Sequence, residues 1–212
     1  MKIAKVLSQN ITLAYEAMDL PNIDTRKLKG VLGTERQPTV METPDTIVVV
    51  FPPEPTVIQL GQKRIRITVP ESGGKVGDVP LWEIAVKCGE LVSGSEHKLI
   101  AYGFNYELMA LSETSSAHAA TMRLFLPNSG AVEAILGGYL SSFTPRLKFQ
   151  RGQTQYDLIL EPLDEQQLKV FMNAHFEYPG VRLPTQDQLH EDFCKGYDYL
   201  VSVLPKLLAG DE

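Results

Sequence analysis

Hydrophobic and polar residues alternate along much of this chain with a period of two, which is typical of β-strands buried on one face. This pattern predicts strands over residues 10–18, 46–51, 57–60, 63–67, 98–111, 147–151, 154–160 and 168–176. Between the first two strands, residues 34–45 contain two prolines and several polar residues, and are expected to form a loop.

Helical spacing of apolar residues appears in two longer segments. Residues 81–92 predict an amphipathic helix, and a second helix is expected from Thr185 toward the C-terminus. Thr185 and Gln188 have the spacing of a capping box, which marks a helix start. Pro205 is expected to kink or end this last helix, because proline lacks a backbone N–H.

Shorter helices are expected elsewhere in the chain. Asp24 is a good N-cap for a short helix that ends in the region from Gly30 to Gly33. Residues 117–126 fit a strand or a helix equally well, and a short helix is expected from Asn128 to Leu136.

Two Gly-Gln pairs are expected to form tight turns, because glycine supplies the positive φ of a type II′ turn. The first turn, at Gly61, is predicted to pair Leu60 with Lys63 and Ile58 with Ile65. In either strand the apolar side chains then share one face, as a half-buried sheet requires.

The second turn, at Gly152, predicts a hairpin of the same kind. It pairs Phe149 with Tyr156 and Lys148 with Asp157, so that aromatic and opposite-charge pairs occupy different faces. The order of elements around the two turns also suggests a βαβββα unit that occurs twice, although coincidence explains the weak residue match.

These elements indicate an α+β fold, with a mostly antiparallel sheet and two helices, the shorter central one and the long C-terminal one, packed on one face. We expect a single domain over residues 1–212. A duplication would divide it into lobes 1–93 and 94–212, which meet near Ser93-Gly94.

Composition narrows the class of protein. Of 212 residues, 43% are hydrophobic and 22% charged, as in globular proteins, and the net charge of −6 disfavours nucleic acid as a partner. Only Cys88 and Cys194 occur, too few for a disulfide framework or a four-cysteine zinc site. No apolar run reaches the ~18 residues of a membrane span, so we expect a cytoplasmic protein without a membrane partner.

Sequence motifs for catalysis are missing. The chain has neither Gly-x-Gly-x-x-Gly nor Gly-x-x-x-x-Gly-Lys-[Ser/Thr], the two glycine-rich patterns that cradle phosphates. Gly-x-Ser-x-Gly is also missing, so the usual nucleophile elbow is not available. We therefore expect no cofactor and favour a protein that is not an enzyme.

The strongest candidate for catalysis or metal binding is Asn173, His175 and Glu177, because alternation along a strand places the three on one face. A carboxylate there could orient the imidazole or share a metal ion. His190 with Cys194 or Glu191 on the last helix is a weaker candidate. Both groups also have an explanation that involves no function: the first is then an ordinary solvent-exposed strand face, and Cys194 a small buried residue at a helix boundary. We predict no metal site.

Basic residues cluster around the first hairpin. Lys63, Arg64 and Arg66, with further basic residues at 26–29, could form a patch for nucleic acid. Aromatic residues suited to base stacking do not interleave with them, which favours a solvated face or an acidic protein partner.

Two functions remain open. The first is a noncatalytic protein-interaction or assembly protein, with a protein partner or a homo-oligomer formed through sheet edges near Pro52-Pro53 or residues 173–177. The alternative is a small-ligand-binding protein or enzyme, with a pocket between the curved sheet and the C-terminal helix. The aromatic residues that could line such a pocket, or fill a core instead, are Tyr102, Phe104, Tyr106 and Tyr156.

Overall fold

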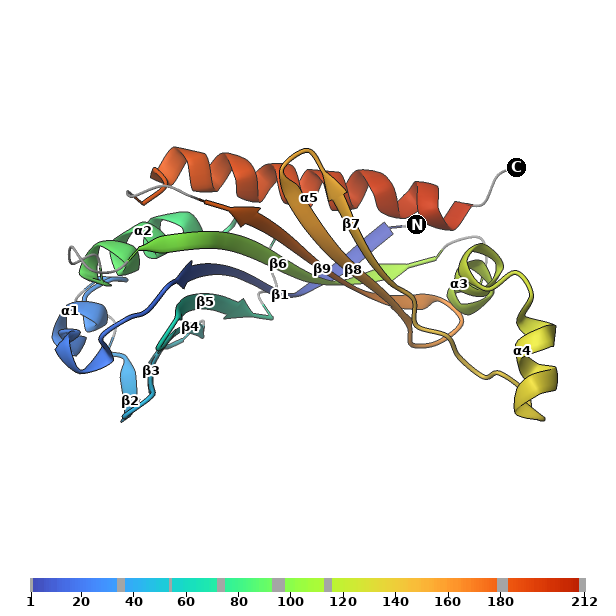
Figure 1. Ribbon diagram of the computed structural model, residues 1–212, viewed down its shortest axis with the longest axis horizontal. Helices are drawn as coiled ribbons and strands as arrows, with labels where there is room; N and C mark the ends of the chain where they lie inside the picture. Colours follow the sequence, from blue (N-terminus) through green and yellow to red (C-terminus); the bar gives the residue numbers. More distant parts are fainter. Residues whose placement is uncertain are drawn as a thin grey trace.

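A long, strongly bent antiparallel sheet dominates the structure (Figure 1). The computed structural model describes residues 2–33, 37–53, 55–71, 75–92, 98–112, 116–178 and 183–209. In these residues the strands are β1 (Lys2–Tyr15), β2 (Thr39–Thr43), β3 (Thr46–Phe51), β4 (Thr56–Gly61), β5 (Arg64–Pro70), β6 (Leu99–Leu111), β7 (Arg146–Arg151), β8 (Thr154–Pro162) and β9 (Gln167–Glu177). They form one sheet in the order β2-β3-β4-β5-β1-β6-β9-β8-β7, and every neighbouring pair is antiparallel.

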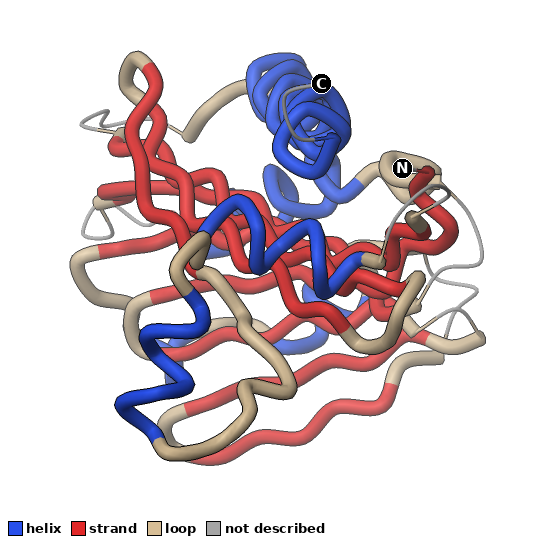
Figure 2. The backbone as a smooth tube through the Cα atoms, turned by 90° about the vertical axis from the view of Figure 1, so that its right-hand side faces the viewer, coloured by secondary structure: helices blue, strands red, loops and turns tan. Residues whose placement is uncertain are grey.

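The helices include α1 (Thr25–Lys29), α2 (Leu81–Val92), α3 (Ala117–Phe125), α4 (Ser129–Leu136) and α5 (Gln186–Ala209), with a short 3-10 helix at Leu20–Asn22. Figures 1 and 2 show α2 and α5 side by side on one face of the central strands. The predicted α+β class, with both of these helices on one face of an antiparallel sheet, is confirmed.

The helix-covered face carries the hydrophobic core. One row of directly paired residues crosses it from edge to edge: Val40, Val49, Ile58, Ile67, Ile11, Phe104, Ala174, Tyr156 and Phe149. The members from Val49 to Ala174 are fully buried, and each fully buried aliphatic or aromatic side chain stabilises the fold by about 1.5–3 kcal/mol.

Several elements agree with the sequence pattern. Helix α2 has the predicted bounds, Gln188 N–H donates to Thr185 Oγ1 at the start of α5, and Asp24 caps α1 through Arg26 N–H. The second hairpin has the predicted register, and Gly152 has a φ of 62°. Residues 117–126, which fitted two structures, contain a helix capped by Ser116.

The first hairpin corrects the predicted register by two residues. Leu60 pairs with Ile65 and Gly61 with Arg64, so the turn is Gln62-Lys63 and Gly61 lies within β4 without a positive φ. The backbone N–H of Met18 donates to the Gln62 carbonyl (2.7 Å), and that of Tyr15 to the Lys63 carbonyl (2.8 Å). These contacts from the end of β1 hold a turn that local preference does not select.

The first hairpin connects β4 and β5, whereas the second connects β7 and β8. Because β5 and β9 are the strands beside β1 and β6, the two Gly-Gln turns are not in equivalent places in the sheet. The duplicated βαβββα unit therefore stays a prediction without support from this motif, and the junction at Ser93-Gly94 lies outside the described residues.

Other strand predictions need correction. Strand β1 begins at Lys2, eight residues before the alternation becomes clear, and β2 occupies part of the expected loop. Strand β2 was missed because most of its residues are exposed, which removes the apolar alternation. The predicted sheet edges near Pro52-Pro53 and at residues 173–177 are wrong. The edges are β2 and β7, whereas β3, which precedes Pro52, and β9, which contains residues 173–177, each have a strand on both sides.

The C-terminal helix passes through Pro205 and ends at Ala209 instead of ending at the proline. Leu204 and Leu208 are buried on either side of Pro205, and their packing holds the last turn. Helix α4 contrasts with α5, because it has no buried residue and leaves Ile135 and Leu136 exposed.

Tyr106 and Gly196 set the distance between β6 and α5. The Tyr106 hydroxyl is buried under the helix and donates to the Phe193 carbonyl (2.5 Å). A Cβ atom at Gly196 would lie 2.8 Å from that hydroxyl oxygen, well inside van der Waals contact.

We expect Gly196→Ala to lower the free energy of unfolding by about 1–3 kcal/mol, because the added methyl group overpacks this contact. In the Tyr106→Phe background the same substitution should be neutral or stabilising by up to about 1 kcal/mol, since the clash is gone and alanine favours the helix. Chemical unfolding of the four proteins measures this coupling. Equal losses in both backgrounds would show that the hydroxyl does not limit the approach.

Candidate functional site

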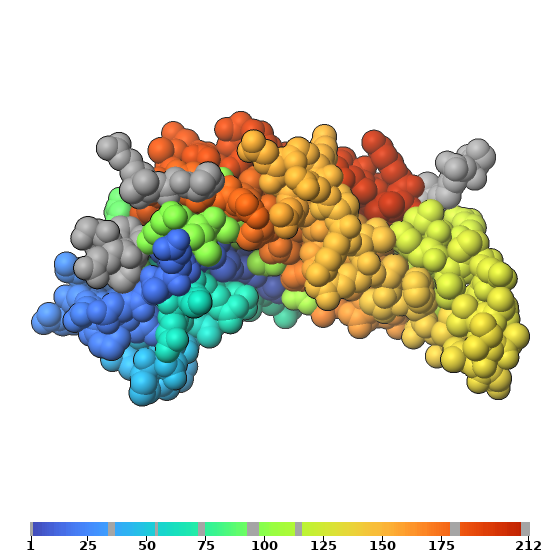
Figure 3. All heavy atoms as spheres, in the orientation of Figure 1, coloured from blue at the N-terminus to red at the C-terminus, as the bar shows by residue number. Residues whose placement is uncertain are grey.

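The face of the sheet opposite the core is polar at its centre. Directly paired residues along one row of this open face are Gln59, Arg66, Thr12, Gly103, His175 and Gln155. Figure 3 shows the molecule hollowed between the end that carries β2 and the end that carries α4. No helix packs on this side of β1, β5, β6 and β9 in the part of the chain that the structure describes.

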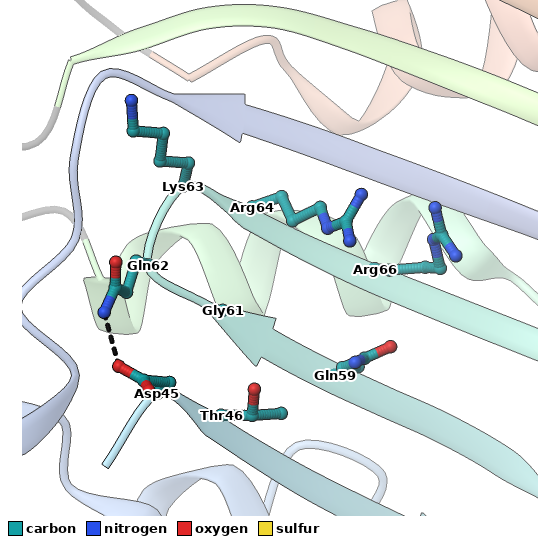
Figure 4. A pocket seen from close by; sticks show the side chains of 8 residues that line it. All are labelled: Asp45, Thr46, Gln59, Gly61, Gln62, Lys63, Arg64 and Arg66. Atoms are coloured by element: carbon teal, nitrogen blue, oxygen red, sulfur yellow. Dashed lines mark hydrogen bonds between the residues drawn. The ribbon is translucent and has the colours of Figure 1, made fainter.

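Three adjoining hollows form a trough across this open face. The outer hollow (Figure 4) is lined by Asp45, Thr46, Gln59, Gly61, Gln62, Lys63, Arg64 and Arg66. The central notch is lined by Thr12, Ala14, Arg66, Ala101, Tyr102, Gly103, Asn105, Asn173 and His175. The distal hollow is lined by Lys148, Phe149, Gln150, Gln155, Tyr156, Asp157, Asn173 and His175.

The three hollows adjoin one another because they share lining residues. Arg66 lines both the outer hollow and the central notch, and Asn173 and His175 line both the notch and the distal hollow. The volumes are about 530 Å³ for each end hollow and about 140 Å³ for the notch.

Arg64 and Arg66 lie two residues apart on β5, so both side chains project from the open face (Figure 4). Neither forms an ion pair with a carboxylate among the described residues. Partial burial lowers the pKa of Arg66, and the positive charge of Arg64 lowers it further. The Arg66 Nε–H is buried and has no hydrogen-bond partner, so this guanidinium is less well satisfied than a protein usually allows.

Acidic side chains in the trough are occupied by other partners. Asp45 accepts a hydrogen bond from Gln62 Nε2 (2.5 Å), the contact drawn in Figure 4. Asp157 forms an ion pair with Arg146, whose Nε donates to Asp157 Oδ1 (2.8 Å), and this hydrogen bond lowers the pKa of the carboxyl. Lys63, Arg64 and Arg66 line the outer hollow against one carboxylate, Asp45, among the described residues, so positive charge is in excess there.

Small residues form the floor of the central notch. Gly103 lies opposite Thr12 on β1 and His175 on β9, and Ala14 and Ala101 are directly paired beside it. A Cβ atom at Gly103 would lie 3.1 Å from the Ala174 carbonyl oxygen, which is tight, so any side chain here would also fill the notch.

A ladder of three asparagines crosses the floor beside the notch. Asn173 Nδ2 donates to Asn105 Oδ1 (2.8 Å), and Asn105 Nδ2 donates to Asn10 Oδ1 (2.7 Å). Each amide orients the next across three neighbouring strands, which leaves the Asn173 oxygen free of a hydrogen bond within the ladder.

The structure brings together residues from two separate sequence candidates. Asn173 and His175 line the same notch as Arg66, while Lys63 and Arg64 line the outer hollow. Glu177 shares their face but is exposed at the end of β9, pairs with Ala101, and lines none of the three hollows.

Sequence reasoning missed Thr12, Gly103 and Asn105 as site residues. A glycine inside an alternating strand was an available signal, because such a glycine often marks a close approach to another group. Thr12 and Asn105 carried no comparable signal, since polar residues are ordinary on the outer face of a strand.

The weaker candidates on α5 do not assemble into a site. The His190 ring stacks on Trp82 with centroids 4.1 Å apart, and Glu191 forms an ion pair with Lys195. Burial, together with the nearby charge of Asp198, raises the pKa of the Cys194 thiol. Within the described ranges, no three His, Cys, Asp or Glu side chains are grouped to hold a metal ion.

The space between the sheet and α5 is filled at its centre and open at one side. Tyr102, Phe104 and Tyr106 are buried in the core. A groove of about 850 Å³ lies between the β7–β8 hairpin and the helix. It is lined by Arg151, Gly152, Thr154, Tyr156, Phe176, Asp192, Lys195, Gly196, Asp198, Tyr199 and Ser202.

Comparison with known proteins gives no relative for this chain: no family matches it, and no curated protein is detectably similar. Among the described helices, none has both the length and the apolar character that crossing a bilayer requires. The function has to be argued from the geometry of the trough and the groove.

We expect Arg66→Met to raise the free energy of unfolding by about 0.5–1 kcal/mol, because it removes a partly buried cation that Arg64 repels and no carboxylate balances. Arg146→Met is the matched control and should lower stability, because Asp157 loses its partner. Urea unfolding measures both. If Arg66→Met lowers the free energy of unfolding as much as the control does, Arg66 stabilises the fold and the expectation is wrong.

Proposed function

We propose that this protein is a noncatalytic interaction protein whose trough binds an acidic, extended segment of a partner protein. The observation that carries this proposal is the pair of arginines, Arg64 and Arg66, with no carboxylate partner among the described residues. A guanidinium group binds carboxylates through two parallel hydrogen bonds, so an acidic segment would satisfy both the charge and the donors.

Charge favours an acidic partner over other polymers. The chain carries a net charge of −6, so positive charge at the outer hollow is a local feature and not a property of the whole surface. Phe149 and Tyr156 border the distal hollow, but their rings lie on the helix-covered face, where both pack against Tyr199 of α5, so they offer no surface for base stacking on the open face.

The dimensions of the trough match a short extended segment. The row from Gln59 to Gln155 crosses six strands, which is five spacings of about 4.8 Å, or about 24 Å in all. At about 3.4 Å per residue, an extended chain of about seven residues covers this length. Side chains would make the contacts, since β9 and β5 lie inside the sheet and have no free backbone edge.

A labelled heptaglutamate peptide tests the proposal by fluorescence anisotropy at low salt, with heptaglutamine and a matched oligothymidylate for comparison. We expect heptaglutamate to bind best, and Arg64→Gln and Arg66→Gln each to weaken binding by about tenfold, the effect of losing one charged hydrogen-bonding partner. Arg26→Gln is the matched control, because Arg26 lies on α1 beside Asp24 and should not matter.

Equal binding of heptaglutamine, or unchanged affinity in Arg66→Gln, would rule out the proposed contact. Tighter binding of the oligothymidylate would move the assignment to single-stranded nucleic acid. The expected homo-oligomer and cytoplasmic location stay predictions, and light scattering of the purified protein measures the first of them.

A second candidate function is small-ligand binding in the groove between the β7–β8 hairpin and α5. Its volume of about 850 Å³ lies within the ~300–1,000 Å³ of small-molecule sites, and Tyr156 and Tyr199 supply an aromatic wall.

For this second function we expect Tyr199→Ala to reduce the fluorescence of bound anilinonaphthalene sulfonate by at least about twofold, because the groove loses its aromatic wall. Tyr139→Ala is the control, since Tyr139 follows α4, is 84% exposed and could bind the dye non-specifically. A larger loss in the control than in Tyr199→Ala would count against a ligand site in the groove.

A further inference from the structure

We infer that the central notch is an anchor site for one acidic side chain of the bound segment. This inference rests on the proposed function and adds a specificity to it. The outer hollow attracts negative charge in general, whereas the notch would select a carboxylate at one position of the segment.

The size of the notch decides between a side chain and a free ligand. Its volume is about 140 Å³, well below the ~300–1,000 Å³ of sites for drug-sized molecules. A carboxylate on a short aliphatic stem fits this space, and the end hollows on either side leave room for the chain that carries it.

Gly103 keeps this space open at a cost to the strand. Glycine weakens a strand interior, and Gly103 does not have the positive φ that would require it. A Cβ atom here would lie 3.1 Å from the Ala174 carbonyl oxygen and 3.6 Å from Asn173 Nδ2, so it would crowd β9 as well as occupy the floor of the notch. The missing side chain is therefore what distinguishes this position.

The groups around the notch suit an anion. Arg66 supplies a positive charge from β5, and the side chains of Asn105, Asn173 and His175 carry N–H donors on β6 and β9. No acidic residue lines the notch among the described residues, and Glu177, which shares this face, is exposed at the end of its strand.

The notch also lacks a competing internal partner for Arg66. The buried Nε–H of Arg66 is unpartnered, so a small reorientation of the side chain toward a bound carboxylate would satisfy a donor that is now unsatisfied. The asparagine ladder holds Asn173 in place from the other side, through its bond to Asn105. An acidic side chain would then be held between Arg66 on β5 and Asn173 on β9.

Labelled peptides of about seven residues, the length that spans the trough, test this inference. Each has two glutamates at one end to engage Arg64 and Arg66, glycine elsewhere, and one central position that is Glu, Gln or Lys. We expect the Glu peptide to bind about fivefold or more tighter than the Gln peptide, because only the carboxylate is charged. The Lys peptide should bind weakest.

Gly103→Ala should abolish the preference for Glu over Gln at the central position, while the affinity for the Gln peptide changes little. Gly130→Ala is the matched control, because an added Cβ there meets nothing within 4 Å. Asn173→Asp is a second variant of the same size as the native residue, and it should reverse the preference toward Lys by placing a carboxylate in the notch.

The possible results separate this inference from the proposed function. If all the acidic peptides bind and Arg66→Gln weakens them, but Glu and Gln bind equally in the native protein, the trough is supported and the notch is overturned. If the Glu preference survives in both Gly103→Ala and Asn173→Asp, the notch is also overturned. If no acidic peptide binds at all, both proposals fail.

Discussion

The pairing of β1 with β6 at the centre of the sheet is the interaction on which the rest of the structure depends. It joins the first strand to a strand that begins more than 80 residues later along the chain, and places Ile11 against Phe104 in the middle of the core row. Strands β5 and β9 then extend the sheet on either side. Because α2 and α5 follow these two strands and contact each other, both helices cover the same face.

Covering one face leaves the other open, and the trough is a result of that asymmetry. Arg66 comes from β5, Gly103 from β6, and Asn173 and His175 from β9, so the central notch exists only because β1 and β6 lie between the outer strands. Two of these residues go against local preference: a glycine weakens its strand, and an arginine lacks a balancing charge. Such departures are expected where a surface serves binding as well as stability.

Much of the fold could be predicted from the sequence, because periodicity and capping are local properties. Helix α2, the second hairpin and the start of α5 all follow from residue spacing, side-chain capping or a glycine with positive φ. The sequence did not decide between a helix and a strand over residues 117–125, because the apolar residues there fit both periods. The edge strand β2 was missed because an exposed strand needs no apolar alternation.

The sequence by itself thus determined the antiparallel α+β class and most of the elements, although not β2, the start of β1 or the choice of helix over residues 117–125. Only the tertiary structure decided the register of the first hairpin, because Tyr15 and Met18 of a distant segment bind its turn carbonyls. It also decided which strands are edges and which polar residues meet. Those outcomes depend on contacts between segments far apart along the chain, and residue spacing within one segment carries no information about them.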